Sequence, residues 1–125
     1  MYLRDFQIVM RSHDFDLYKR AREIWEPIEL RICARIPKRF VFGDVKKVVI
    51  EVGPEPRGKP YRVLLDVGLF HYPDFDMHHF LQDSHKNQIA TVVGVVRDSF
   101  RVLSQQFDTP IAWLVEELDR IQSES

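Results

Sequence analysis

The sequence predicts an α+β fold: a four-stranded, mostly antiparallel sheet covered on one face by helices. Two observations support this expectation. Segments in which polar and apolar residues alternate occur before residue 73, and apolar residues spaced by three and four occur after it. Alternation with a period of two is typical of half-buried strands, whereas the longer spacing is typical of helices. A length of 125 residues suits one domain, so we expect residues 1–125 to form a single domain.

The first strand and the first helix are expected before residue 28. Residues 1–10 alternate loosely and predict a strand. Ser12 or Asp14 is expected to cap the helix that follows, because a short oxygen side chain can accept hydrogen bonds from the free N–H groups at a helix start. Pro27 disfavours helix at the residue before it, so this helix is expected to end near Trp25.

Three further strands are expected between residues 28 and 70. Residues 28–36 show the clearest alternation in the chain, with Ile28, Leu30, Ile32, Ala34 and Ile36 on one side. Residues 45–52 place Val48, Ile50 and Val52 on one side, and residues 61–70 do the same with Tyr61, Val63, Leu65, Val67 and Leu69. A Pro- and Gly-rich stretch at residues 53–60 predicts an exposed loop. Short connections between successive strands favour antiparallel neighbours.

Three helices are expected after residue 73, which gives the element order βαβββααα. The first spans about residues 74–84 with Asp74 as its N-cap. The second, residues 89–107, has the strongest helical pattern, an apolar stripe of Ile89, Val92, Val93, Val96, Phe100, Leu103 and Phe107. The third is expected to begin with Pro110 at its first position and to run to about Ile121.

The net charge of −1 conceals an asymmetry along the chain. Residues 31–62 hold nine Lys/Arg and three acids, whereas residues 63–125 hold four Lys/Arg and ten acids. The simpler interpretation is that solvated faces balance each other across one domain. The alternative is an acidic helical surface that attracts a basic partner. We expect a cytoplasmic protein, because the chain has a single cysteine, Cys33, and no evident export signal. We also expect no membrane span, because no long apolar run is present.

Four of the five histidines lie between residues 71 and 85, among several aspartates. On a helix, His79 would share a face with both Asp76 and Asp83, and His78 would share one with His85. Such a cluster suits a metal or a proton-transfer pair. No His-Glu-x-x-His spacing is present, so we expect no metal and no cofactor. His78, His79, Asp76 and Asp83 are the candidate catalytic residues of one alternative, a small metal- or histidine-dependent hydrolase or nuclease.

A basic cluster at the predicted strand ends could contact the phosphates of a nucleic acid. It comprises Lys38, Arg39, Lys46, Lys47, Arg57 and Lys59. The P-loop spacing and the aromatic strand motif of RNA-binding domains are both missing, so nucleic-acid binding is not favoured.

Trp113 lies about 200° round the last predicted helix from Ile111, away from its apolar stripe. An aromatic residue flanked by acids suits a protein–protein contact, although Trp113 could instead pack against the first strand or Trp25. The predicted protein-binding residues are Trp113, Glu116, Glu117, Asp119 and Asp108.

In size, charge and lack of a catalytic motif, the chain resembles the small bacterial immunity proteins that neutralise a cognate toxin. The resemblance is one of general type, and its residue support is the acidic surface just named. It implies a basic toxin domain as partner, bound by acids that mimic nucleic acid or another anionic substrate. We therefore favour a non-catalytic protein-binding module, with a homodimeric structural or regulatory protein as a further alternative.

Overall fold

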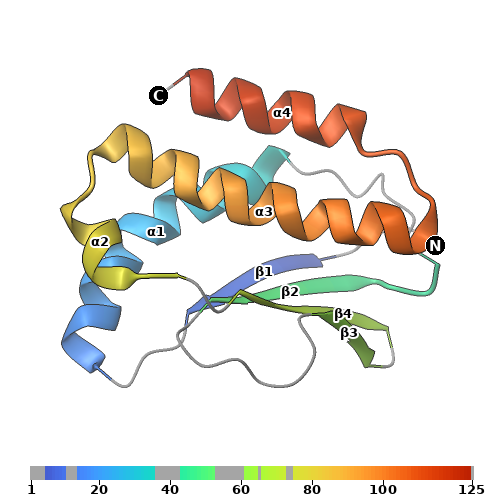
Figure 1. Cartoon of the computed structure of the whole chain (residues 1–125), viewed down its shortest axis with the longest axis horizontal. Coiled ribbons are helices and arrows are strands. Elements are labelled where there is room, and N and C mark those ends of the chain that lie inside the picture. Colours follow the sequence, from blue (N-terminus) through green and yellow to red (C-terminus); the bar gives the residue numbers. More distant parts are fainter. Residues whose placement is uncertain are drawn as a thin grey trace.

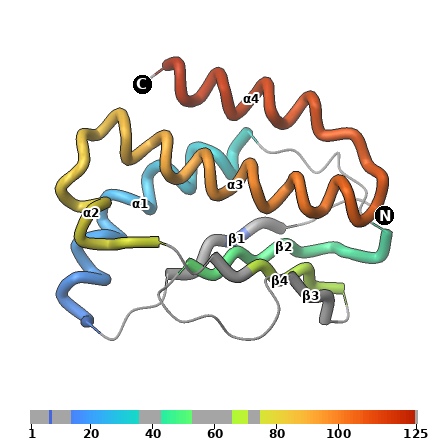
Figure 2. The backbone as a smooth tube through the Cα atoms, in the orientation of Figure 1, coloured from blue at the N-terminus to red at the C-terminus, as the bar shows by residue number. Residues whose placement is uncertain are grey.

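The computed structural model describes residues 5–10, 14–35, 43–52, 61–64, 66–72 and 75–124. In chain order, its elements are β1 (Asp5–Met10), α1 (Phe15–Arg35), β2 (Lys47–Val52), β3 (Tyr61–Leu64), β4 (Val67–Tyr72), α2 (Met77–Gln82), α3 (His85–Phe107) and α4 (Ala112–Ser123). Figure 1 shows α3 running along the sheet, with α4 on the side of α3 that is away from the sheet. The backbone trace in Figure 2 shows α1 passing behind α3, and side-chain contacts join its C-terminal end to α4.

The sheet is mixed, and this overturns the predicted fold class. The strand order is β1-β2-β4-β3, in which β1–β2 and β2–β4 are parallel and only β3–β4 is antiparallel. The described residues are also predominantly helical. The expectation of a mostly antiparallel sheet is wrong because α1 connects β1 to β2 as a crossover, which makes that pair parallel. The short hairpin then places β4, not β3, beside β2.

The strand predicted at residues 28–36 is wrong, because α1 continues through Pro27 and ends at Arg35. Leu30, which was expected on the buried side of that strand, is 62% exposed. The buried residues of α1 instead follow a helical spacing, and they are Ala21, Trp25, Ile28, Glu29 and Ile32. Ile28 and Ile32 fit both periods, and only the helical period places them on one face with the buried Trp25.

The strand predicted at residues 61–70 is two strands joined by a turn at Asp66. The Asp66 carbonyl accepts a hydrogen bond from the Lys46 backbone N–H at 2.8 Å, which ties the turn to the start of β2. In β4, Gly68 and Phe70 are buried, so Val67 and Leu69 lie on the opposite face from the one predicted. The alternation predicted for β2 is confirmed, since Val48, Ile50 and Val52 are buried. The predicted loop at residues 53–60 lies outside the described residues.

The helix ends show which capping predictions hold. Asp14, one of the two predicted caps, caps α1 through its Oδ1, which accepts the Leu17 N–H at 3.1 Å, and Ser12 lies outside the described residues. The N-cap of α2 is Asp76, not Asp74, which lies outside the described residues. The last helix begins at Ala112, two residues after the predicted Pro110. None of the described helices is long and apolar enough to cross a lipid bilayer.

The core joins the helical layer to β2. The predicted stripe of α3 is buried from Ile89 to Leu103, while Phe107 at its end is half-buried. An aromatic cluster fills the end of the core nearest α2. Trp25 lies 5.1 Å from Phe75 and 5.6 Å from Phe80, measured between ring centroids, with Phe75 and Phe80 5.3 Å apart. This cluster fixes α2 against α1, which positions the surface described next.

Candidate binding cleft

A cleft of about 330 Å³ lies between α2 and α3. Phe75 and Phe80 line it on the side of α2, and Asp76 and His79 lie at its rim. Because Asp76 and His79 are exposed while Phe75 and Phe80 are buried, the cleft leads from solvent to an apolar wall.

The α3 side of the cleft is formed by residues on one face of that helix. Thr91, Gly94, Val95 and Asp98 recur at steps of three and four, which is the spacing of neighbours on a helix surface. A Cβ atom placed on Gly94 would meet nothing within 4 Å. The missing side chain therefore leaves open space in the wall rather than allowing a close approach of two backbones.

Polar contacts fix the corner between α2 and α3. Gln88 is buried, and its Nε2 donates to the Phe80 carbonyl at 2.9 Å. Asp83 ends α2, and its Oδ1 accepts a hydrogen bond from Asn87 Nδ2 at 3.1 Å. Ser84 caps α3 through the Asn87 N–H. Together with the aromatic cluster, these bonds hold the two walls of the cleft in one arrangement.

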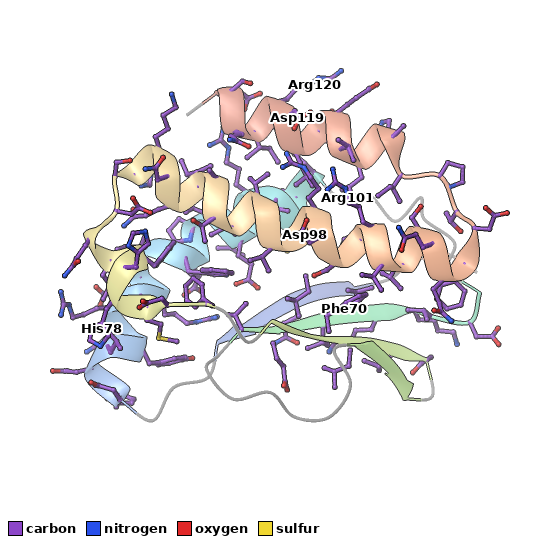
Figure 3. All side chains as sticks on the ribbon, viewed as in Figure 1. Phe70, His78, Asp98, Arg101, Asp119 and Arg120 are labelled. Atoms are coloured by element: carbon purple, nitrogen blue, oxygen red, sulfur yellow. The ribbon has the colours of Figure 1, made fainter. Side chains whose placement is uncertain are left out.

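Two carboxylates contribute negative charge to the rim. Asp76 is exposed, and its Oδ1 accepts the His79 backbone N–H at 3.1 Å as the N-cap of α2. Asp98 is exposed on α3 and lies 3.8 Å from Arg101, measured from Oδ1 to the guanidinium. Figure 3 labels Asp98 and Arg101 on the same side of α3. The cleft thus combines an apolar wall with acid groups from two elements.

The structure brings together only part of the predicted histidine cluster. His79 Nε2 lies 3.6 Å from Asp83 Oδ2, as their spacing predicted. His78 is exposed on α2, away from the cleft (Figure 3). His85 contacts Gln88 through Nδ1 at 3.3 Å. Among the described residues, no three His, Cys, Asp or Glu side chains are grouped so that they would hold a metal ion.

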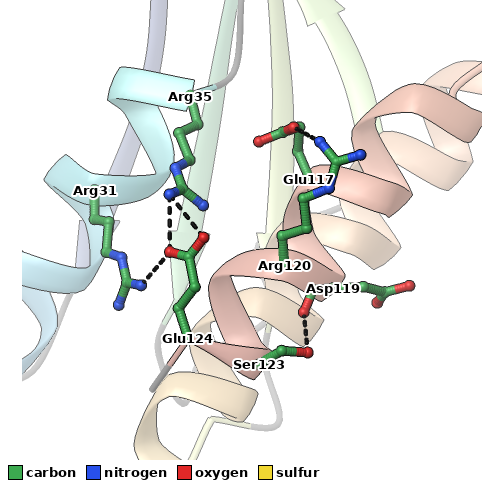
Figure 4. A network of polar contacts seen from close by, with 7 residues as sticks. All are labelled: Arg31, Arg35, Glu117, Asp119, Arg120, Ser123 and Glu124. Atoms are coloured by element: carbon green, nitrogen blue, oxygen red, sulfur yellow. Dashed lines mark hydrogen bonds and ion pairs between the residues drawn. The ribbon is translucent and has the colours of Figure 1, made fainter.

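Arginine side chains neutralise two of the acids on the predicted binding surface of α4. Arg97 donates to Asp119 Oδ1 at 2.6 Å, and Arg120 pairs with Glu117 (Figure 4). Glu116 is exposed. Trp113 is half-buried and packs against the core. Asp108 is the C-cap of α3 and has a left-handed backbone with φ of 48°.

A further ion-pair group joins α4 to the end of α1. Glu124 accepts hydrogen bonds from Arg35 at 2.8 and 2.9 Å and from Arg31 at 2.7 Å (Figure 4). These guanidinium groups, Arg35 first, hold the pKa of Glu124 below its ordinary value. Sequence reasoning did not find this group, because 89 residues separate Arg35 from Glu124.

The helix N-terminus at the cleft does not favour an anion. Asp76 already accepts an N–H of α2 that a phosphate would use, and it adds negative charge. Of the predicted basic cluster, Lys46 and Lys47 lie at the start of β2, and the other members are outside the described residues. The cleft is therefore suited to neutral or cationic groups.

The sequence pattern indicated Asp76 and His79 as candidate site residues, but not Asp98 or Gly94. A lone glycine inside a strong helical pattern was the available signal, because it marks a place without a packed side chain. Comparison with known proteins identifies no relative: no family model matches the chain, and searches of curated proteins and of solved structures find no match.

Proposed function

We propose that the chain is a non-catalytic protein-binding module that receives a partner at the cleft between α2 and α3. The observation that carries this proposal is the combination of a buried aromatic wall with an exposed charged rim. Binding energy in protein interfaces is concentrated where an anchoring side chain enters such a pocket and a polar rim excludes water.

The surface beside the cleft supports a contact wider than one side chain. Val102 is 39% exposed and lies seven residues after Val95, on the same face of α3. Val102 thus adds one exposed apolar side chain on this face of the helix, beyond Asp98. The cleft stands between two helices fixed by caps and buried hydrogen bonds, so a partner would bind without ordering it first.

Toxin neutralisation is the specific form of this proposal that the resemblance to immunity proteins suggests. The pairing of Asp119 and Glu117 with arginines weakens the support for a surface that mimics an anionic substrate. Glu116 and Asp108 are exposed acids that remain suitable for a second contact on this side. We therefore place the main contact at the cleft and retain α4 as an accessory surface.

The test is a Gly94→Leu variant, which fills the cleft. The space around Gly94 accepts a side chain, so the fold is expected to be retained, and circular dichroism verifies this. Gln105→Leu is the matched control, because it adds the same side chain to an exposed position on the same helix. Tagged wild type and both variants are used to capture a crosslinked partner from lysate of the native host.

We expect a stoichiometric partner with the wild type and with Gln105→Leu, and its loss with Gly94→Leu. Equal capture by all three proteins would reject the cleft as the docking point, and a Glu116→Lys variant would then test α4. Light scattering on the free protein decides whether the captured partner is a second copy of this chain.

A further inference from the structure

We infer that the cleft between α2 and α3 takes a basic side chain, arginine or lysine, presented by a protein partner. This inference rests on the proposed function for the source of the side chain. Its chemistry is derived from the lining of the cleft.

The charge of the cleft favours a cation. Its described lining has three titratable groups, the carboxylates of Asp76 and Asp98 and the imidazole of His79. The carboxylates come from the start of α2 and from the middle of α3, so acid groups belong to both walls. The N-terminus of α2 carries partial positive charge, but Asp76 caps this helix of six residues and offsets it.

A guanidinium group of the chain itself already approaches one of these carboxylates. Arg101 lies 3.8 Å from Asp98 Oδ1, which is beyond hydrogen-bond distance, and its side chain is 59% exposed. Such a loose surface pair contributes little to stability. A basic side chain that enters the cleft can add a charge-assisted hydrogen bond to the exposed carboxylate of Asp98.

The apolar wall suits the stem of a long basic side chain. Arginine and lysine carry three or four methylene groups that pack on apolar surface while the charged head stays near water. Phe75 and Phe80 supply that surface, with Trp25 behind them. Aromatic rings also attract a nearby cation. A volume of about 330 Å³ is near the lower end of ligand pockets, which fits one side chain rather than a folded segment.

The first experiment tests the chemistry with a defined probe. N-acetyl-arginine amide is titrated into the protein, and amide NMR signals of Thr91, Gly94 and Asp98 are followed. N-acetyl-citrulline amide is the control, because it has nearly the same shape without the charge. We expect saturable shifts with the arginine probe and at least about tenfold weaker binding of the citrulline probe. Equal binding of both probes, or saturation by neither, would overturn the inference.

Charge-neutral variants locate the contact. Asp98→Asn and Asp76→Asn are each expected to weaken binding of the arginine probe about two- to fivefold, the range of an exposed ion pair. Asparagine at position 76 retains the capping oxygen, so α2 is preserved. Glu116→Gln on α4 is the matched control and should leave the affinity unchanged. Unchanged affinity in both aspartate variants would contradict the assignment.

The second experiment separates this inference from the proposed function. The captured partner is tested with an Asp76→Asn/Asp98→Asn double variant, whose capture is expected to fall as strongly as with Gly94→Leu. A partner lost with Gly94→Leu but retained by the double variant would leave the proposed function standing and overturn the basic side chain. Binding of the arginine probe without any protein partner would overturn the protein source and assign the cleft to a free cationic ligand.

Discussion

At the scale of single residues, Gly43 shows how one backbone angle constrains the packing of two distant segments. Its φ is +58°, and a Cβ placed on it would lie 2.9 Å from Cε1 of Phe107 at the end of α3. The residue just before β2 thus lies against the last turn of a helix far along the chain. Glycine satisfies both demands, because it accepts a left-handed conformation and leaves room for the ring.

We predict that Gly43→Ala lowers the free energy of unfolding by about 1–2 kcal/mol, the cost of a left-handed conformation for a residue with a Cβ. Movement of the Phe107 ring would add to this cost. Urea unfolding followed by circular dichroism measures it. Asp108→Gly is the matched control, because Asp108 has φ of 48° and glycine relieves its strain, so the unfolding midpoint should stay or rise. A wild-type midpoint for Gly43→Ala would refute the account.

At the scale of elements, α1 shows a helix that tolerates an internal proline. Pro27 lies within the 21 residues of α1 and is exposed, so its ring contributes no core packing. The helix persists because Trp25 and Ile28 on either side of it are buried. Tertiary packing thus outweighs the local preference that led the sequence analysis to end the helix near Trp25.

Replacing this proline should stabilise the protein. An internal proline destabilises a helix by about 3 kcal/mol. It also stabilises the folded protein by about 0.4–1 kcal/mol, because it lowers the conformational entropy of the unfolded chain. We therefore expect Pro27→Ala to raise the free energy of unfolding by about 2 kcal/mol, measured by urea titration. Glu23→Ala, at another exposed position of α1, is the control and should change it by less than about 0.5 kcal/mol. A lower midpoint for Pro27→Ala would show that the proline is required.

The sequence predicted an element correctly where its apolar residues fit only one period, that of a helix or that of a strand. The stripe of α3 and the alternation of β2 each fit a single period, and both predictions are confirmed. Residues 28–36 fit two periods, because Ile28 and Ile32 belong to a strand pattern and to the helical series that includes Trp25. The choice between them depends on the aromatic cluster with Phe75 and Phe80, which local sequence does not show.

The sheet and the cleft depended on contacts between distant elements. In the sheet, β4 lies between β2 and β3 and pairs with β2 in parallel. The spacing of the strands in the sequence does not determine which strand of the β3–β4 hairpin lies beside β2. In the cleft, Asp76 and His79 both line the α2 side, and the sequence predicted only that they share a helix face. Asp98 and Gly94 line the cleft only because α2 lies beside α3, a contact that the local sequence does not show.

At the scale of the whole molecule, the chain closes by fastening its last helix to its first. The contacts of α4 are chiefly with α3 and α1 rather than with the sheet. Leu114, Leu118 and Ile121 bury its inner face. Two ion-pair groups then hold its outer flanks, Asp119 with Arg97 on α3, and Glu124 with Arg31 and Arg35 on α1. The second group joins the C-terminal end of α1 to the residue that follows α4.

The pKa of Glu124 determines the pH range in which its ion pairs with Arg31 and Arg35 stabilise the fold. Arg35 and Arg31 lower that pKa, so the folded protein binds a proton on Glu124 less readily than the unfolded chain does. The stabilisation is therefore complete above the ordinary glutamate pKa of about 4.3 and is lost as the pH falls through the lowered value. Salt should weaken it further, because the pair is at the surface.

We predict that Glu124→Gln lowers the urea midpoint at pH 7 and that the difference from wild type shrinks as the pH is lowered below about 4.3, when the wild-type carboxylate also becomes neutral. Urea titrations between pH 7 and pH 3 measure this difference. Arg35→Gln is the matched variant, because it removes the cationic partner of Glu124 and leaves the carboxylate. It should lower the midpoint at pH 7 and move the NMR titration of the Glu124 carboxyl group to higher pH. A difference between Glu124→Gln and wild type that stays constant across this range would mean that the lost contact is not ionic, and that α4 is held by its apolar face alone.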